Sequence, residues 1–397
     1  MAAVSGMRGR RAGAGRPGGP SRTSRARTPG YRLRRALAVT LLGGTIAAVA
    51  FLILSFSGSS SQHRGRTTQA ERSAAAAARA SRRTRPASRH GSATRAGPGP
   101  YRVGKASIRV LEPAANAAPN AKTSSGQPAR ALPTVVRYPA LGTAGGGADP
   151  SATPDRAAGP FPLVVFSQGY DFPAEGYSAL LDAWARAGYV VADPTYPFTD
   201  PSTPGGAQEN DIVNHPADLR FVISTLLSQS NDSGNPLHGM LKASAVAVIG
   251  HSDGGDVTLA AAVNTCCRDP AVKAAVILSG AELGAFGGTY YGSGGVPLLV
   301  IQGDADTVNL PGCSVELYDQ APAPKYYVNL PGAEHQPPYL TPGPTRSHVT
   351  QAVIGFLDGY LKNEPAGLLS LRRAASAAGI ATITSSPTLP GLGTYCP

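Results

Sequence analysis

The chain has 397 residues and a formal net charge of +12, and this charge is distributed very unevenly. Residues 1–100 carry 19 arginines and one acidic residue, Glu71, a balance of +18, whereas residues 101–397 carry a balance of −6. The basic excess therefore belongs to a low-complexity N-terminal region and not to a folded basic face, which argues against a nucleic-acid partner.

The N-terminal region has the charge pattern of a membrane anchor. Ten arginines precede Ala36, and residues 36–56 contain no charged side chain. As a helix, 21 residues extend roughly 30 Å, the thickness of the hydrocarbon core of a bilayer. We expect residues 1–35 to be a basic cytoplasmic segment and residues 36–56 to be an uncleaved signal anchor, because arginine-rich flanks stay in the cytoplasm. A cleaved signal peptide, which would yield a secreted protein, is the alternative.

Residues 57–100 are rich in Ala, Arg, Ser, Gly and Pro and offer little to bury, so they are predicted to form a disordered tether. Residues 101–397 then form the extracytoplasmic domain, which holds Cys266, Cys267, Cys313 and Cys396. Outside the cytoplasm disulfides persist. We expect at least one of the two adjacent cysteines to pair with Cys313 or Cys396 rather than with its neighbour. A zinc site is the alternative.

From residue 101 onward, short apolar β-runs alternate with helix-period segments. This alternation predicts an α/β fold with a mostly parallel sheet, helices on both faces and antiparallel first strands. Strands are predicted at residues 107–111, 134–138, 162–166, 189–192, 245–249, 274–278, 297–301 and 325–330, and helices at 174–187, 212–228, 255–263, 312–320 and 346–362.

The stretch AVAVIGHSDGG, residues 245–255, carries the main chemical signal. It is typical of a buried strand, a sharp turn and a helix, with Ser252 at the apex of the turn. Gly250 and Gly254 flank the serine, and a side chain at either glycine would collide where strand and helix pack. This geometry predicts an exposed serine hydroxyl.

Other reactive side chains follow neighbouring strands, whose carboxyl ends form the ligand-binding edge of such sheets. Asp304 and Asp306 follow the strand at 297–301, and His335 follows the strand at 325–330. A serine needs a base to accept its proton, and a carboxylate that orients this base makes it effective. The backbone amides of Asp253 and Tyr170 would stabilise the developing oxyanion.

The pieces RALPTVVRYPA, PLVVFSQGY, GHSDGG, PLLVIQGDADTVN and GAEH resemble the α/β-hydrolase superfamily over residues 134–362. Within it they resemble the branch of plasma-type platelet-activating-factor acetylhydrolase, chlorophyllase, dienelactone hydrolase and cutinase-like polyester hydrolases. The resemblance implies Ser252 as nucleophile, Asp306 as triad acid, His335 as base, and the amides of Tyr170 and Asp253 as the oxyanion hole. The mechanism expected from these residues requires no cofactor and no metal.

Several alternatives stay open at these positions. Asp304 is the rival acid, expected instead to cap a turn. His215 and His348 are the rival bases, expected instead to be satisfied surface histidines, while His251 is expected to pack or hydrogen-bond locally. The chain departs from the family pattern at Gln168 and Asp253, and a carboxylate beside the nucleophile would repel anionic substrates.

The segment at residues 280–296 is too short for a large cap domain. The sequence thus predicts a single-pass membrane protein whose extracytoplasmic domain is a serine esterase or lipase-like carboxylic ester hydrolase. Its substrate would be a small-molecule, lipid or polymer ester, cleaved through an acyl-enzyme. The alternatives are an acyltransferase that uses the same triad and a non-catalytic envelope binding protein with a hydrolase fold.

Overall fold

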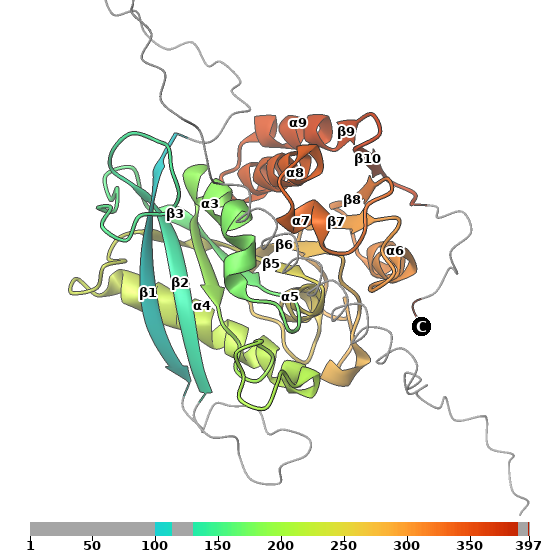
Figure 1. Cartoon of the computed structure of the whole chain (residues 1–397), viewed down its shortest axis with the longest axis horizontal. Coiled ribbons are helices and arrows are strands. Elements are labelled where there is room, and N and C mark those ends of the chain that lie inside the picture. Colours follow the sequence, from blue (N-terminus) through green and yellow to red (C-terminus); the bar gives the residue numbers. More distant parts are fainter. Residues whose placement is uncertain (1–99, 113–129, 388–395, 397) are drawn as a thin grey trace, which may run out of the picture.

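The computed structural model describes residues 100–112, 130–387 and 396, and Figure 1 labels most of its helices and strands. The strands are β1 (Arg102–Glu112), β2 (Arg130–Ala140), β3 (Phe161–Ser167), β4 (Val190–Pro194), β5 (Leu241–His251), β6 (Val272–Leu278), β7 (Leu298–Gly303), β8 (Lys325–Leu330), β9 (Ser376–Ala377) and β10 (Ala381–Thr384). The α-helices are α3 (Ser178–Arg186), α4 (His215–Asn231), α5 (Asp253–Val263), α6 (Pro311–Gln320), α7 (Pro337–Leu340), α8 (Pro344–Leu361) and α9 (Pro365–Ala374), and the 3₁₀ helices are η1 (Ala174–Tyr177), η2 (Glu209–Asn214) and η3 (Gly284–Phe286).

The described strands form one sheet in the order β1-β2-β4-β3-β5-β6-β7-β8-β10-β9. The six strands from β4 to β8 in this order are mutually parallel, whereas β1, β2, β9 and β10 pair antiparallel. The predicted mostly parallel sheet with antiparallel first strands is therefore confirmed. The carboxyl ends of β3, β5, β7 and β8 lie at one edge, which is where the polar loops meet.

Helices cover both faces of this sheet (Figure 1). On β3, Leu163 and Val165 pack into one core cluster with α4, α5 and α6, while Val164 and Phe166 pack into the other with α3, α8 and α9. The alternation is the period-two pattern of a strand whose two faces are both buried. Between β6 and β7 the chain forms η3, turns and isolated β-bridges, so no large cap domain is inserted there.

The structure corrects the expected cysteine pairing. Cys266 is bonded to its neighbour Cys267, and Cys313 of α6 is bonded to Cys396. The expectation that the adjacent cysteines would avoid each other was wrong, because both lie in a tight turn after α5, which the N–H of Cys267 closes on the carbonyl of Asn264. The second bond fastens Cys396, near the C-terminus, to α6.

The predicted segments 1–35, 36–56 and most of 57–100 lie outside the described residues. In the part of the chain that is described, no helix is both long and apolar enough to cross a bilayer. The anchor at residues 36–56 therefore stays a prediction.

Candidate active site

Ser252 occupies the turn between β5 and α5 with backbone angles φ 57° and ψ −126°. A positive φ is rare for a residue other than glycine and is tolerated where surrounding structure enforces it. A Cβ on Gly250 would overlap the carbonyl group of Gly254, and one on Gly254 would overlap the carbonyl of Ser167. The predicted need for both glycines is confirmed, and it follows from the close approach of strand β5, helix α5 and the loop after β3. Ser252 itself is only 7% exposed, so the expected exposed serine was wrong, because the same close approach covers it.

His335 and Asp306 meet across two neighbouring strand ends, after β8 and β7. The Nδ1 atom of His335 lies 2.7 Å from Oδ2 of Asp306, and both side chains are buried. An ionised carboxylate only accepts hydrogen bonds, so Nδ1 carries the hydrogen and Nε2 is left as an acceptor. This is the tautomer that a general base requires.

The rival carboxylate Asp304 has different partners. Its Oδ1 accepts the backbone N–H of Gly332, and its Oδ2 accepts an N–H of Asn329 at 3.0 Å. These contacts tie the loop after β7 to the end of β8, a turn-capping arrangement of the kind expected for Asp304. Of the two carboxylates, Asp306 is the one hydrogen-bonded to His335.

A second histidine, His251, joins the three loops that surround Ser252. Its Nε2 lies 3.0 Å from the carbonyl oxygen of His335, and its Nδ1 lies 2.7 Å from the hydroxyl of Tyr177. Because a carbonyl accepts, Nε2 carries the hydrogen and Nδ1 accepts from the tyrosine. The same hydroxyl accepts the N–H of Gly169 at 3.4 Å. The expectation of a local hydrogen bond for His251 was wrong: its partners are far away in the sequence, and it links the serine turn to the loop after β3 and to the His335 loop.

The two amides expected to face the oxyanion come from elements that converge on Ser252. Asp253 is the first residue of α5, where the N–H groups and the helix dipole favour negative charge. Tyr170 follows Gly169, whose added Cβ would lie 3.2 Å from Cβ of Ser252. The hydroxyl of Tyr170 donates to the carbonyl of Ala207, which holds this loop against residues 195–208.

Neither of the rival histidines takes part in this arrangement. His215 at the start of α4 stacks on Tyr196 with ring centroids 4.2 Å apart and lies 3.5 Å from Asp211. It is buried, so the expected surface position was wrong, because Tyr196 and η2 cover the first turn of α4. His348 on α8 lies 2.8 Å from the carbonyl oxygen of Ala374 and is half-buried.

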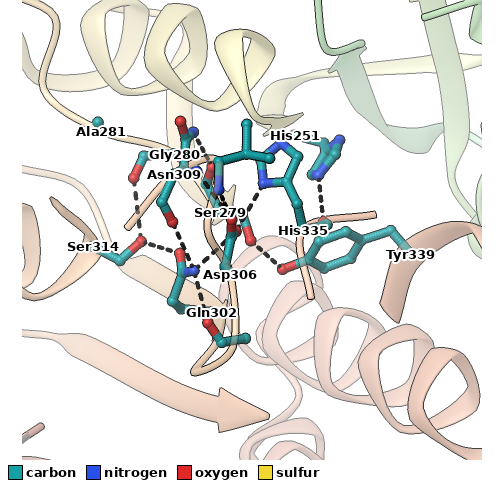
Figure 2. A network of polar contacts seen from close by, with 12 residues as sticks. His251, Ser279, Gly280, Ala281, Gln302, Asp306, Asn309, Ser314, His335 and Tyr339 are labelled. Carbon is teal, nitrogen blue, oxygen red and sulfur yellow. Dashed lines mark hydrogen bonds and ion pairs between the residues drawn. The ribbon is translucent and has the colours of Figure 1, made fainter. Parts of the chain in front are cut away.

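Asp306 rests on a network of neutral groups that the sequence analysis did not single out (Figure 2). Its Oδ1 accepts the N–H groups of Val308 and Asn309, both at 2.9 Å, and its Oδ2 also accepts an N–H of Gln302 at 3.1 Å. Tyr339 donates to the carbonyl of Ile301 and lies 2.9 Å from the Ser279 hydroxyl. The available signal was weak: Gln302 is a polar residue at the end of an otherwise apolar strand.

No group of His, Cys, Asp and Glu among residues 100–112, 130–387 and 396 is arranged to hold a metal ion. The candidate site brings together a strained serine turn, a histidine–carboxylate pair and the backbone of the loop after β3. This arrangement can deprotonate a hydroxyl and receive negative charge beside it.

Comparison with known proteins agrees with this geometry. Residues 151–279 match the chlorophyllase family model, a segment that includes β3, the Tyr170 loop and Ser252 but ends before Asp306 and His335. No curated protein sequence matches the chain significantly. Among solved structures, a ferulic acid esterase from Streptomyces cinnamoneus is 20% identical, with a TM-score of 0.55 over 73% of this chain and 98% of that one. Together with the sheet order and the serine turn, the match identifies the chain as a protein with the α/β-hydrolase fold.

Proposed function

We propose that the protein is a serine hydrolase that cleaves carboxylic esters through an acyl-enzyme. The observation that carries the proposal is Ser252 in its positive-φ turn, linked through the adjacent His251 to the loop of the His335–Asp306 pair. The chlorophyllase family model and the ferulic acid esterase both favour an ester hydrolase.

In this mechanism Oγ of Ser252 attacks the ester carbonyl while Nε2 of His335 accepts the serine proton. Asp306 stabilises the imidazolium that forms and holds the ring in its tautomer. The amides of Asp253 and Tyr170 donate to the oxyanion; losing one such donor typically costs about 10²- to 10³-fold in kcat. His335 returns the proton to the leaving alcohol, and a water molecule then releases the acid from Ser252 by the same steps.

The proposed location is the outer face of the cytoplasmic membrane, with residues 36–56 as a single anchor. The support is the uncharged stretch itself and the ten arginines before it. The four cysteines of the catalytic domain, paired in two disulfides, fit an oxidising compartment.

Hydrolysis of p-nitrophenyl esters from acetate to palmitate by the full-length protein tests the proposal. Ser252→Ala is expected to lower kcat by about 10⁵-fold or more, as removal of a triad serine does. A fluorophosphonate probe should label the wild-type protein at Ser252 and leave the variant unlabelled. Wild-type protein that neither hydrolyses any ester nor reacts with the probe would contradict the proposal and favour a binding protein. Transfer of the acyl group to an added alcohol in preference to water would point to an acyltransferase.

A further inference from the structure

A fully buried amide lies beneath the carboxylate of Asp306. Gln302, the residue before β7 ends at Gly303, is 0% exposed. Its Nε2 donates to Oδ2 of Asp306 at 3.1 Å, the same oxygen that accepts from His335 (Figure 2). The amide nitrogen also lies 3.0 Å from the carbonyl oxygen of Gly303 and 3.2 Å from that of Asn309.

The other end of this amide contacts a hydroxyl on a different element. Ser314 of α6 donates from Oγ to Oε1 of Gln302 at 2.7 Å, and the same Oγ lies 3.2 Å from the carbonyl oxygen of Gly280. Since the three oxygens around Nε2 all accept, the amide nitrogen has to face Asp306 and Oε1 has to face Ser314. Ser314 follows Cys313, which is bonded to Cys396 near the C-terminus. Both polar atoms of the Gln302 amide are therefore hydrogen-bonded, Nε2 to Asp306 and Oε1 to Ser314.

The two oxygens of Asp306 are held in different ways. Backbone amides of the loop after β7 hold Oδ1, and these remain whatever the side chains are. Side chains, those of Gln302 and His335, hold Oδ2. His335 becomes charged and neutral again during each proposed catalytic cycle, so Gln302 is the constant restraint on the oxygen that must face the imidazole.

We propose that Gln302 is a positioning residue for the reaction, which keeps Oδ2 of Asp306 aimed at Nδ1 of His335, and that the Ser314 hydroxyl supports its amide from the other side. The inference rests on the proposed function of the Ser252, Asp306 and His335 set. Gln302 touches no substrate; it acts through the carboxylate. A misplacement of about 1 Å in a catalytic group can cost about 100-fold in rate.

The test uses Gln302→Met, which keeps the length of the side chain and removes the donor. In the full-length protein we expect kcat for a p-nitrophenyl ester to fall about 10- to 100-fold, with KM close to that of the wild type. The matched control is Asn329→Leu, which removes the same kind of amide–carboxylate bond from Asp304. This control should retain the wild-type kcat.

Gln302→Glu supplies a readout that loss of packing would not produce. The introduced carboxyl group can donate to Asp306 when it is protonated and repels Asp306 when it is ionised. The ratio of the kcat of Gln302→Glu to that of Gln302→Met should therefore rise as the pH falls. Ser314→Ala keeps Gln302 but removes the donor to its Oε1, and a loss smaller than that of Gln302→Met is expected. Ser314→Ala also serves if Gln302→Met does not fold.

A measurement independent of activity separates this inference from the proposed function. The Nδ1–H of His335 should give a low-field proton resonance in wild-type protein, which broadens in Gln302→Met and persists in Asn329→Leu. If the wild type hydrolyses no ester, the proposed function fails while the resonance still tests Gln302. The inference would be overturned if folded Gln302→Met kept both the resonance and the kcat of the wild type. It would also be overturned if Asn329→Leu lost as much of the resonance and of kcat as Gln302→Met does.

Discussion

Buried carboxylates lie at two places along the same edge of the sheet, and they differ in the groups that hydrogen-bond to them. At one end, Arg130 donates to Asp211 and Asp218, with side-chain distances of 2.6 to 3.1 Å. Burial alone would lower the pKa of the Arg130 guanidinium, but its hydrogen bonds to the two carboxylates raise it above its usual value. At the other end, Asp306 is held by neutral amides and by His335.

Under the proposed mechanism, the difference separates carboxylates that stabilise the fold from one that takes part in the reaction. Asp211 and Asp218 already form ion pairs with a permanent cation, the guanidinium of Arg130, and these ion pairs hold β2 against η2 and α4. Neutral N–H donors stabilise the Asp306 carboxylate without cancelling its charge, which stays available to a cation that forms beside it. We expect substitutions at the first group to change stability and substitutions at Asp306 to change the rate of catalysis.

Asp306→Asn should have the largest effect of the substitutions in this comparison. The amides of Val308 and Asn309 would keep an oxygen at the Oδ1 position, so the new NH₂ group would face Nδ1 of His335. Nδ1 would then have to accept, and the hydrogen would move to Nε2, the wrong tautomer for a base. A loss of about 10⁴-fold in kcat is expected, measured by ester hydrolysis. The new NH₂ group would also face the Nε2 donor of Gln302, so the melting temperature should fall as well.

Asp304→Asn is the matched control for this variant, because Asp304 lies in the same loop and bonds Asn329 and Gly332 instead of a histidine. It should keep most of the activity. If Asp304→Asn lost as much activity as Asp306→Asn, the assignment of Asp306 as the triad acid would be wrong.

Arg130→Met should act on the other group and reduce stability. Without the guanidinium, Asp211 and Asp218 would remain buried without the cation that they share, and breaking a buried pair in this way typically costs about 3–5 kcal/mol. Chemical denaturation would measure the loss in the free energy of unfolding. The kcat of the folded protein should stay near the wild-type value.

Arg102→Met provides the surface counterpart, because the side chains of Arg102 and its partner Asp149 are 38% and 30% exposed. Exposed pairs of this kind contribute about 0–1 kcal/mol. A loss at Arg102 equal to that at Arg130 would show that burial does not distinguish the two pairs.

The parts of the molecule that the sequence predicted well are those specified locally. The apolar runs specify the parallel strands, since each run is buried on both faces. The serine turn is specified by Gly250 and Gly254, which are close in sequence to Ser252 and contact the neighbouring backbone directly. Asp306 and His335 each follow a predicted parallel strand, and from this the sequence correctly predicted that both lie at one edge of the sheet.

Contacts between residues far apart in the sequence could not be predicted in this way. The bond between Tyr177 and His251 joins residues 74 positions apart, and Cys313 pairs with a residue 83 positions away. Gln302 could not be distinguished from an ordinary strand-end residue until Ser314 and Asp306 were seen on either side of it. The pairing of Cys266 with Cys267 depends on the geometry of one turn, which composition does not specify.

Glu112, at the end of β1, adds a third buried carboxyl group to those of Asp211 and Asp218 around Arg130. Burial, followed by its hydrogen bond to Asp218, raises the pKa of Glu112 from 4.5 to about 8. A raised pKa in the folded protein means that its stabilising contribution is complete below about pH 4.5 and is lost as the pH rises to about 8. Within this window the free energy of unfolding should fall by up to about 1.4 kcal/mol per pH unit.

Glu112→Gln mimics the protonated acid and should remove that dependence, whereas Glu364→Gln, at an exposed position, should not. Melting temperatures from about pH 5 to about pH 8, the window set by the raised pKa of Glu112, would measure both variants. Parallel curves for the wild type and Glu112→Gln would mean that Glu112 is ionised throughout this range, and that a single arginine then balances three buried carboxylates.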